Sequence, residues 1–340
     1  LFFEFFKTGL SALAVLTAVS FTSCDDWTET ESEDLDFGTI DKVDPAAYAK
    51  YLQNLRDYRT TDHKKVYAWF NNTDNFVSQA NRLTALPDSI DVVSLTDPAN
   101  VTIGLMREMD KVRRDKGMEI IYPVDFDKFK AAYTAKMELA TEEEPVTESF
   151  KGFLTDSLAK SLDYVKQFGF DGICIAYNGK ATPHLDKDEL AEYAANERLF
   201  IGILTDWHKR NADKSIDYIG KPQNLLDKSL LDDCRMIFLS DGVNATNINL
   251  FSYYTALANT EGVPAEKLGM VAAAKSVDPQ DVKTGMFTDG TRALAGLASW
   301  VAVNPVAGIG IFNAQDDYYN PDRVYPYTRD CIQAANPSAK

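Results

Sequence analysis

The sequence predicts a single parallel (β/α)8 barrel. Short apolar runs alternate with longer amphipathic stretches along the chain, the order of strands and helices that builds a parallel sheet. Eight such runs occur, which is the number that closes this kind of barrel. They lie in a body of about 290 residues that no Pro/Gly/Ser-rich linker divides. A hydrophobic content of 45% and an aromatic content of 11% can fill one large core.

The eight runs are predicted to be strands because they are short and apolar, with many β-branched or aromatic residues. They cover residues 65–70, 90–95, 118–124, 170–177, 216–219, 235–239, 268–273 and 308–312. Helical patterns lie between them, for example at 155–167, 188–211, 247–259 and 290–301. The first and fifth strands are the least distinct, and the run at 216–219 is short.

An open, doubly wound sheet is the alternative to the barrel. Such sheets often carry a glycine-rich phosphate loop, and here Gly308-Ile309-Gly310 is a lone, short match to that pattern. We interpret these glycines as bringing a strand close to its neighbours.

In a (β/α)8 barrel the ligand site lies where the strands end and the loops meet. The predicted strands end in aromatic, amide and acidic side chains, which include Trp69, Asn71, Tyr177, Asn178, Asp241, Asn313, Gln315 and Tyr319. Sugars present apolar C–H faces and hydroxyl groups, so aromatic platforms and amide or carboxylate partners suit them. The sequence therefore favours a carbohydrate ligand. The alternative for Trp69, Phe70 and Phe312 is that they fill the barrel core.

The fourth strand carries the most informative motif, which reads GFDGICIAYNG over residues 169–179. It resembles the signature strand of glycoside hydrolase family 18, the chitinases and endo-β-N-acetylglucosaminidases. Cys174 and Ala176 stand at that family's two inner aspartate positions, and Asn178 stands at the position of its proton-donating glutamate. An amide forms hydrogen bonds but cannot protonate a leaving oxygen. The motif predicts a pseudo-enzyme with no catalytic residue at these degenerate positions.

Side-chain alternation divides this strand into two faces. Ile173, Ile175 and Tyr177 are predicted to face the surrounding helices. Cys174 and Ala176 are predicted to face the barrel axis, where small neutral groups need no charge compensation.

The resemblance implies a ligand that contains N-acetylglucosamine, either the core of an N-glycan or a chitin oligosaccharide. Asn178 would hydrogen-bond near the former scissile link, while Tyr177, Trp69 and Tyr319 would stack on sugar rings. Hydroxyl groups would be bound by Asn313, Gln315 and Asp241. Two alternatives stay open. One is an active enzyme that uses a relocated carboxylate, with Asp125, Asp241, Asp316 and Asp317 as candidates. The other is an assembly component of an uptake system.

The beginning of the chain is predicted to be an export signal over residues 1–24, with an apolar core too short for a membrane span. Phe21-Thr22-Ser23-Cys24 resembles a lipobox, which implies lipidation at Cys24; a plain secretory signal is the alternative. Residues 25–58 are predicted to form an acidic tether and lead-in, and 59–340 the barrel. The acidic cluster after Cys24 resembles a surface-export signal. It implies a lipid anchor in the outer membrane and exposure at the cell surface. The chain also resembles glycan-capturing lipoproteins that sit beside outer-membrane uptake systems, which implies a transporter as partner.

The net charge of −16 disfavours nucleic acid and anionic polysaccharides as partners, but it does not repel a neutral glycan. Cys174, Cys234 and Cys331 have no CxxC spacing and are predicted to be buried free thiols. His184 follows the fourth strand and could contact a ligand, although a solvated loop histidine is the preferred interpretation. No metal or cofactor is predicted.

Overall fold

The computed structural model describes residues 40–73, 77–141 and 145–337. The chain divides into two compact units, residues 1–45 and 46–340. In the first unit, the described part contains the short helix α1 (Ile40–Val43). The predicted export signal, the lipidation site at Cys24 and residues 25–39 of the predicted tether and lead-in lie outside the described residues.

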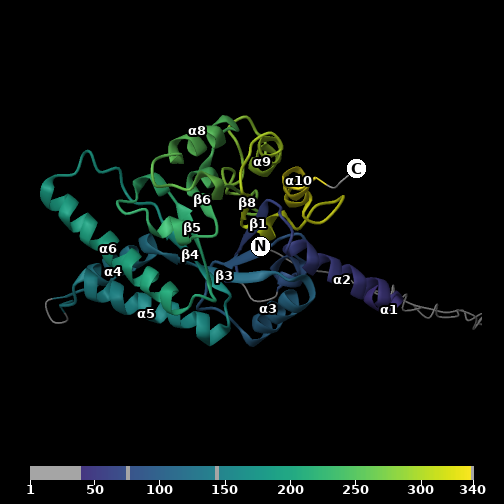
Figure 1. Ribbon diagram of the computed structural model, residues 1–340, viewed down its shortest axis with the longest axis horizontal. Coiled ribbons are helices and arrows are strands. Elements are labelled where there is room, and N and C mark those ends of the chain that lie inside the picture. Colours follow the sequence, from purple (N-terminus) through teal and green to yellow (C-terminus); the bar gives the residue numbers. More distant parts are fainter. Residues whose placement is uncertain (1–39, 74–76, 142–144, 338–340) are drawn as a thin grey trace, which may run out of the picture. The chain divides into compact units, whose positions relative to one another are not determined.

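Within the described residues, eight parallel strands close into a barrel in the order of the sequence, and the predicted fold is confirmed (Figure 1). The strands are β1 (Lys65–Phe70), β2 (Val92–Leu95), β3 (Glu119–Asp125), β4 (Gly172–Tyr177), β5 (Ser215–Gly220), β6 (Ile237–Leu239), β7 (Leu268–Ala273) and β8 (Gly308–Phe312). The uncertain fifth strand is a full member of the barrel, because β5 pairs with β4 on one side and β6 on the other.

Helices surround the strands (Figure 1). They are α2 (Pro45–Arg59), α3 (Ile103–Lys116), α4 (Phe126–Glu138), α5 (Phe150–Phe168), α6 (Lys187–Arg210), α7 (Leu230–Asp233), α8 (Asn249–Ala258), α9 (Ala293–Val301) and α10 (Pro326–Ala335). Two short 3-10 helices, η4 (Ser240–Asn244) and η6 (Ala314–Asp317), follow β6 and β8. In the part of the chain that the structure covers, every helix is too short or too polar to cross a membrane.

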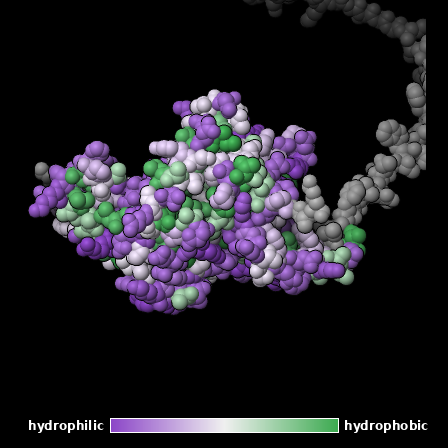
Figure 2. Space-filling model, turned by 45° about the horizontal axis from the view of Figure 1, so that its top comes forward, coloured by the Kyte–Doolittle hydropathy of each residue, from purple (hydrophilic) through white to green (hydrophobic). Residues whose placement is uncertain are grey.

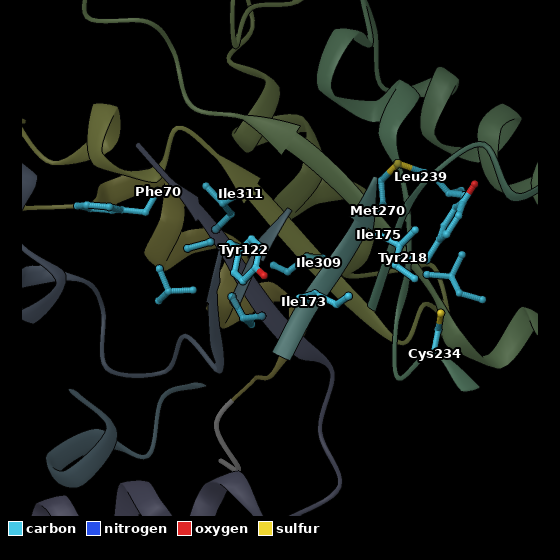
Figure 3. Close-up of a cluster of buried hydrophobic side chains, with 14 of the residues drawn as sticks. Phe70, Tyr122, Ile173, Ile175, Tyr218, Cys234, Leu239, Met270, Ile309 and Ile311 are labelled. Atoms are coloured by element: carbon cyan, nitrogen blue, oxygen red, sulfur yellow. The ribbon is translucent and has the colours of Figure 1, made fainter. Parts of the chain in front are cut away.

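Two groups of buried residues form the core. The inner group fills the barrel and contains Tyr67, Trp69, Cys174 and Phe238. The outer group lies between the strands and the helices, and Figure 3 shows part of it, including Ile173 and Ile175 of β4. Alternating side chains of each strand supply the two groups, as the pleat requires.

Gly310 shows why glycine is needed on the eighth strand. A Cβ atom there would lie 2.6 Å from the Trp69 ring and 2.6 Å from a methyl carbon of Val271. The absence of a side chain makes room for the Trp69 ring inside the barrel, and the prediction that this segment lies close to its neighbours is confirmed.

The inner face of the barrel also holds an ionic group near the amino-terminal ends of the strands. The Asp217 carboxylate is fully buried, and Arg235 donates to it at 2.8 Å. The Tyr67 hydroxyl donates to the same carboxylate at 3.0 Å, and the backbone N–H of Met236 donates at 3.1 Å. Arg235 also bonds Glu119 at 2.7 Å. A buried charge is tolerated here because each oxygen has donors.

Candidate functional site

The inward face of β4 is neutral, as the alternation predicts. Cys174 is completely buried in the barrel, and this burial raises the pKa of its thiol well above the usual value. Ala176 is the next inward residue and is half-buried near the carboxyl end of the strand. At neutral pH the thiol keeps its proton and alanine has no ionisable group, so these two side chains supply no acid or base.

Asn178 follows the end of β4, and hydrogen bonds connect it to three other residues. Its side-chain oxygen accepts a hydrogen bond from the Ser240 hydroxyl at 2.8 Å. Its side-chain nitrogen donates to an Asp127 oxygen at 3.2 Å, and its backbone carbonyl accepts from Asn224 at 2.9 Å. Because oxygen and nitrogen of this amide have different partners, its orientation is fixed.

An open cleft of about 670 Å³ lies beside Asn178, where the loops after β4, β5 and β6 meet. We call it the amide cleft, and its lining residues are Asn178, Gly179, Lys180, Ala181, Lys221, Gln223, Asn224, Ser240, Asp241, Asn244 and Leu257. Lys221 and Asp241 form an ion pair of 2.9 Å in its wall. The buried side-chain oxygen of Gln223 has no hydrogen-bond partner. The amide side chains of Gln223, Asn224 and Asn244 line the cleft, and amides suit a ligand with hydroxyl or acetamido groups.

The predicted residues of β1 and of the segment after β8 form a second polar group. The Gln315 side-chain oxygen accepts from the backbone N–H of Asn71 at 3.2 Å, and the Gln315 side-chain nitrogen donates to Asp316 at 3.2 Å. Burial raises the pKa of Asp316 to about 6. Asn313 precedes this group in a left-handed backbone conformation, with φ of 51°.

Trp69 is not an exposed platform, which corrects the stacking role predicted for it. Its side chain is 2% exposed and stacks on Phe312, with the ring centroids 4.6 Å apart and an angle of 10° between the planes. The alternative reading of Trp69 as a core residue is therefore correct. Phe312 is half-buried at the end of β8 and is the more accessible ring of the pair.

Tyr177 is also unable to stack on a ligand at the barrel axis. It points outward and is 2% exposed, with its ring packed between Phe126 and Phe200. Its hydroxyl donates to Glu197 at 2.9 Å. Tyr319, in contrast, is 66% exposed, as expected, and its ring lies against Tyr318.

The four candidate carboxylates occupy different surroundings. Asp125 caps α4 by accepting from the backbone N–H of Asp127 at 2.9 Å, and burial raises its pKa. Asp241 is neutralised by Lys221. Asp317 is buried and accepts from the backbone N–H of Thr328 at 2.7 Å. Burial raises the pKa of Asp316 to about 6, a value that suits proton transfer near neutral pH.

The remaining candidates are simpler. Cys174, Cys234 and Cys331 are buried free thiols, as predicted. His184 is exposed in the loop after β4. Among the described residues, no three His, Cys, Asp or Glu side chains gather closely enough to hold a metal ion.

A network behind Asn178 was not predicted from the sequence. Glu197 of α6 is 3% exposed and accepts from the hydroxyls of Tyr177 and Tyr193, at 2.9 and 3.1 Å, and from the backbone N–H of Leu226 at 2.8 Å. The Tyr193 hydroxyl in turn accepts from the backbone N–H of Lys180 at 3.0 Å. The sequence does contain a signal for this network. Glu197 lies in the middle of an amphipathic helix, at a position that faces the strands, where an apolar residue is expected.

The comparisons with known proteins agree with this architecture. A family model described as glycoside hydrolase family 18, BT1044-like, matches residues 28–334. A solved selenomethionine form of BT1044 with a glutamate-to-glutamine substitution is 17% identical, with a TM-score of 0.59, and the match covers 86% of this chain and 94% of that one. An endo-β-N-acetylglucosaminidase from Cordyceps militaris is 15% identical, with a TM-score of 0.54 and coverages of 85% and 96%.

A third solved structure, of YKL-39 in the presence of chitooligosaccharides, is 9% identical with a TM-score of 0.52, and the match covers 80% of this chain and 99% of that one. No curated protein sequence matches the chain. At these identities the structural likeness concerns the fold. The family match, which spans the barrel from before its first strand to its last helix, goes further: this chain belongs to glycoside hydrolase family 18, in its BT1044-like group.

Proposed function

We propose that this protein binds a neutral oligosaccharide containing N-acetylglucosamine, of the N-glycan core or chitin type, and does not hydrolyse it. The observation that carries the proposal is the chemistry of β4 and its end. An alanine, a cysteine and a hydrogen-bonded asparagine occupy the places where a family 18 enzyme needs carboxylic acids. Loss of general acid–base assistance alone costs about two to four powers of ten in rate.

The amide cleft supports the choice of ligand. Asparagine and glutamine side chains can donate to and accept from hydroxyl and acetamido groups, and several of them line this cleft. The net charge of −16 disfavours an anionic ligand but has no effect on a neutral one. Two proteins of the same fold are an endo-β-N-acetylglucosaminidase and YKL-39, which was solved in the presence of chitooligosaccharides, and both are consistent with this ligand class.

A calorimetric titration of the purified protein with a high-mannose N-glycan and with chitotriose tests the binding. We expect saturable heat with at least one of them, and a loss of affinity of about tenfold in Asn178→Ala, the equivalent of one or two hydrogen bonds. Exposed Asn259, at the end of α8, provides the matched control Asn259→Ala. The absence of heat with both glycans would contradict the proposal and favour a role in assembly.

A second candidate function is hydrolysis by a relocated carboxyl group. It is favoured by one observation, the pKa of about 6 that burial gives Asp316 at the end of the barrel. Such a carboxyl group could act as a general acid near neutral pH. This candidate predicts glycan cleavage that Asp316→Asn abolishes and that Asp241→Asn leaves unchanged.

We also propose that the protein is a lipoprotein anchored through Cys24 in the outer membrane and exposed at the cell surface, where it could pass a glycan to a transporter. The sequence before the barrel supports this, with its apolar signal, small residues before Cys24 and acidic residues after it. Metabolic labelling with a radioactive fatty acid should mark the wild-type protein and not Cys24→Ala. Protease treatment of intact cells should then digest the barrel.

A further inference from the structure

A second hollow lies outside the barrel, between α4 and α6. We call it the helix groove, and its volume is about 350 Å³, within the range of small-ligand sites. Its lining residues are Phe126, Asp127, Lys130, Tyr133, Thr134, Phe150, Tyr177, Gly179, Lys180, Leu185, Glu189, Glu192, Tyr193 and Asn196. Figure 2 shows apolar residues gathered among hydrophilic ones on the left of the molecule, the side on which Figure 1 places these helices.

The groove contains aromatic rings that the core does not bury. Tyr133 of α4 and Phe150 of α5 lie 5.3 Å apart, and Phe126 lies 6.0 Å from Phe150. All three rings are half-buried, and α4, which the structure describes throughout, has no buried residue at all. An amphipathic helix normally hides its aromatic side chains in the core. Here they line a surface that is open to a ligand.

The border of the groove is polar and carries both signs of charge. Lys130 and Lys180 provide positive charges, while Asp127, Glu189 and Glu192 provide negative ones. Because neither sign prevails strongly, the groove has little electrostatic preference for an ion. Rings flanked by carboxylate, amide and ammonium groups match the apolar faces and hydroxyls of a neutral sugar.

The helix groove and the amide cleft meet at one segment of chain, since Gly179 and Lys180 line both. This segment is held tightly. Gly179 has a left-handed backbone with φ of 59°, and a Cβ atom there would lie 2.9 Å from the Tyr193 hydroxyl. The Tyr193 hydroxyl links Lys180 to the buried Glu197. Two polar hollows separated by a short, fixed segment can bind parts of the same molecule.

We propose that the helix groove holds a second part of the glycan, a branch or an extension of the chain whose core lies in the amide cleft. This inference rests on the proposed function and names its substrate class: a branched or extended neutral oligosaccharide, preferred over a short linear one. The preference arises because a longer ligand stacks on Tyr133 and Phe150, whereas a di- or trisaccharide fills the amide cleft alone.

The chain offers a matched pair of variants for a test. Thr134 and Thr155 are exposed threonines, on α4 and α5, and each hydroxyl bonds the carbonyl four residues earlier, at 3.1 and 2.8 Å. Thr134 lines the groove and Thr155 does not. Thr134→Trp therefore obstructs the groove, and Thr155→Trp adds the same ring elsewhere. Tyr133→Ala is a second groove variant, which removes a ring instead of adding one.

The experiment compares the affinities of these proteins for a high-mannose N-glycan and for chitotriose. We expect Thr134→Trp and Tyr133→Ala to weaken binding of the N-glycan about tenfold and to leave chitotriose unaffected, with Thr155→Trp like the wild type. Asn178→Ala should weaken both ligands. Unchanged N-glycan affinity in both groove variants would overturn the groove assignment and leave the proposed function standing. No binding of either glycan by the wild type would overturn the proposed function and, with it, this inference.

Discussion

Two neighbouring strands present different side chains to the barrel interior. On β5, the carboxylate of Asp217 is buried completely, with donors from Arg235, Tyr67 and the Met236 backbone. On β4, the neutral side chains of Cys174 and Ala176 face the same interior. The two strands lie side by side, and Cys174 pairs with Asp217 across them.

The difference shows what a buried carboxylate requires. Asp217 is retained where an arginine, a hydroxyl and an amide satisfy it, because an unpaired buried charge is very costly. A catalytic acid is different, because it must stay free to exchange protons with the substrate. On the inward face of β4, this chain carries the neutral residues Cys174 and Ala176 in place of such an acid. We therefore interpret the buried Asp217 cluster as structural, and the carboxyl end of β4, at Ala176 and Asn178, as the binding surface.

The largest expected effect comes from a carboxylate placed on the neutral inward face of β4. Cys174→Asp should destabilise the protein by roughly 4 kcal/mol at pH 7, because the new group is buried beside Asp217. Burial and the neighbouring carboxylate raise the pKa of the new group in the folded state. Its penalty is therefore small at pH 4 and grows as the pH rises towards that raised pKa. Chemical denaturation at the two pH values measures this, with Cys174→Ser as the control.

Removal of the buried charge on β5 should have the next largest effect. Asp217→Asn leaves Arg235 without its buried partner, and we expect a loss of about 3 kcal/mol in the free energy of unfolding. Glu119 bonds the same arginine but its side chain is 43% exposed. Glu119→Gln should therefore cost less than about 1 kcal/mol. Equal losses in the two variants would contradict the structural role of Asp217.

Substitution of Asp316 should have a smaller effect on the free energy of unfolding, and the size of that effect should depend on pH. Its pKa of about 6 in the folded state lies above the usual value, so the folded protein binds this proton more tightly than the unfolded chain does. The resulting stability is present below about pH 4 and is lost as the pH rises through 6. Relative to the wild type, Asp316→Asn should gain about 1 kcal/mol between pH 4 and pH 7.5, a value reduced for solvent screening. Thermal unfolding across this range measures the gain.

The smallest effect on stability is expected for the ion pair in the wall of the amide cleft. The ion pair between Lys221 and Asp241 is partly exposed, so Lys221→Met should change the free energy of unfolding by less than about 1 kcal/mol. Its effect on glycan affinity should be larger, because both residues line the amide cleft. A variant with strongly reduced stability and unchanged affinity would place this pair on the structural side of the comparison.

Much of the fold follows from the sequence. The eight strands lie within a few residues of their predicted positions, because each one is a short apolar run between helical patterns. The helix predicted at 188–211 corresponds to α6 (Lys187–Arg210). A helix such as α4 is harder to recognise, since it buries no residue and has no continuous apolar face.

The site was predictable only in part. Asn178 follows β4 and Asp241 follows β6, with β5 between them, so strand order places both at the same end of the barrel. Tyr177 shows the conflict between two arguments: alternation places it on the helix side, whereas a stacking role needs it at the cleft, and the structure follows alternation. The bond between Glu197 and Tyr177 depends on how α6 packs, which no local pattern of residues reveals.

The measurement that tests the central claim most directly is a single-turnover assay. The wild-type protein, in excess over an N-glycan with a chitobiose core, is incubated overnight at several pH values. The glycan is then recovered, and its mass is measured by mass spectrometry. Binding is verified in the same samples by retention of the glycan on the protein. The account predicts that bound glycan is recovered intact at every pH. Cleavage within the chitobiose core by the wild-type protein, and its loss in Asp316→Asn, would contradict it.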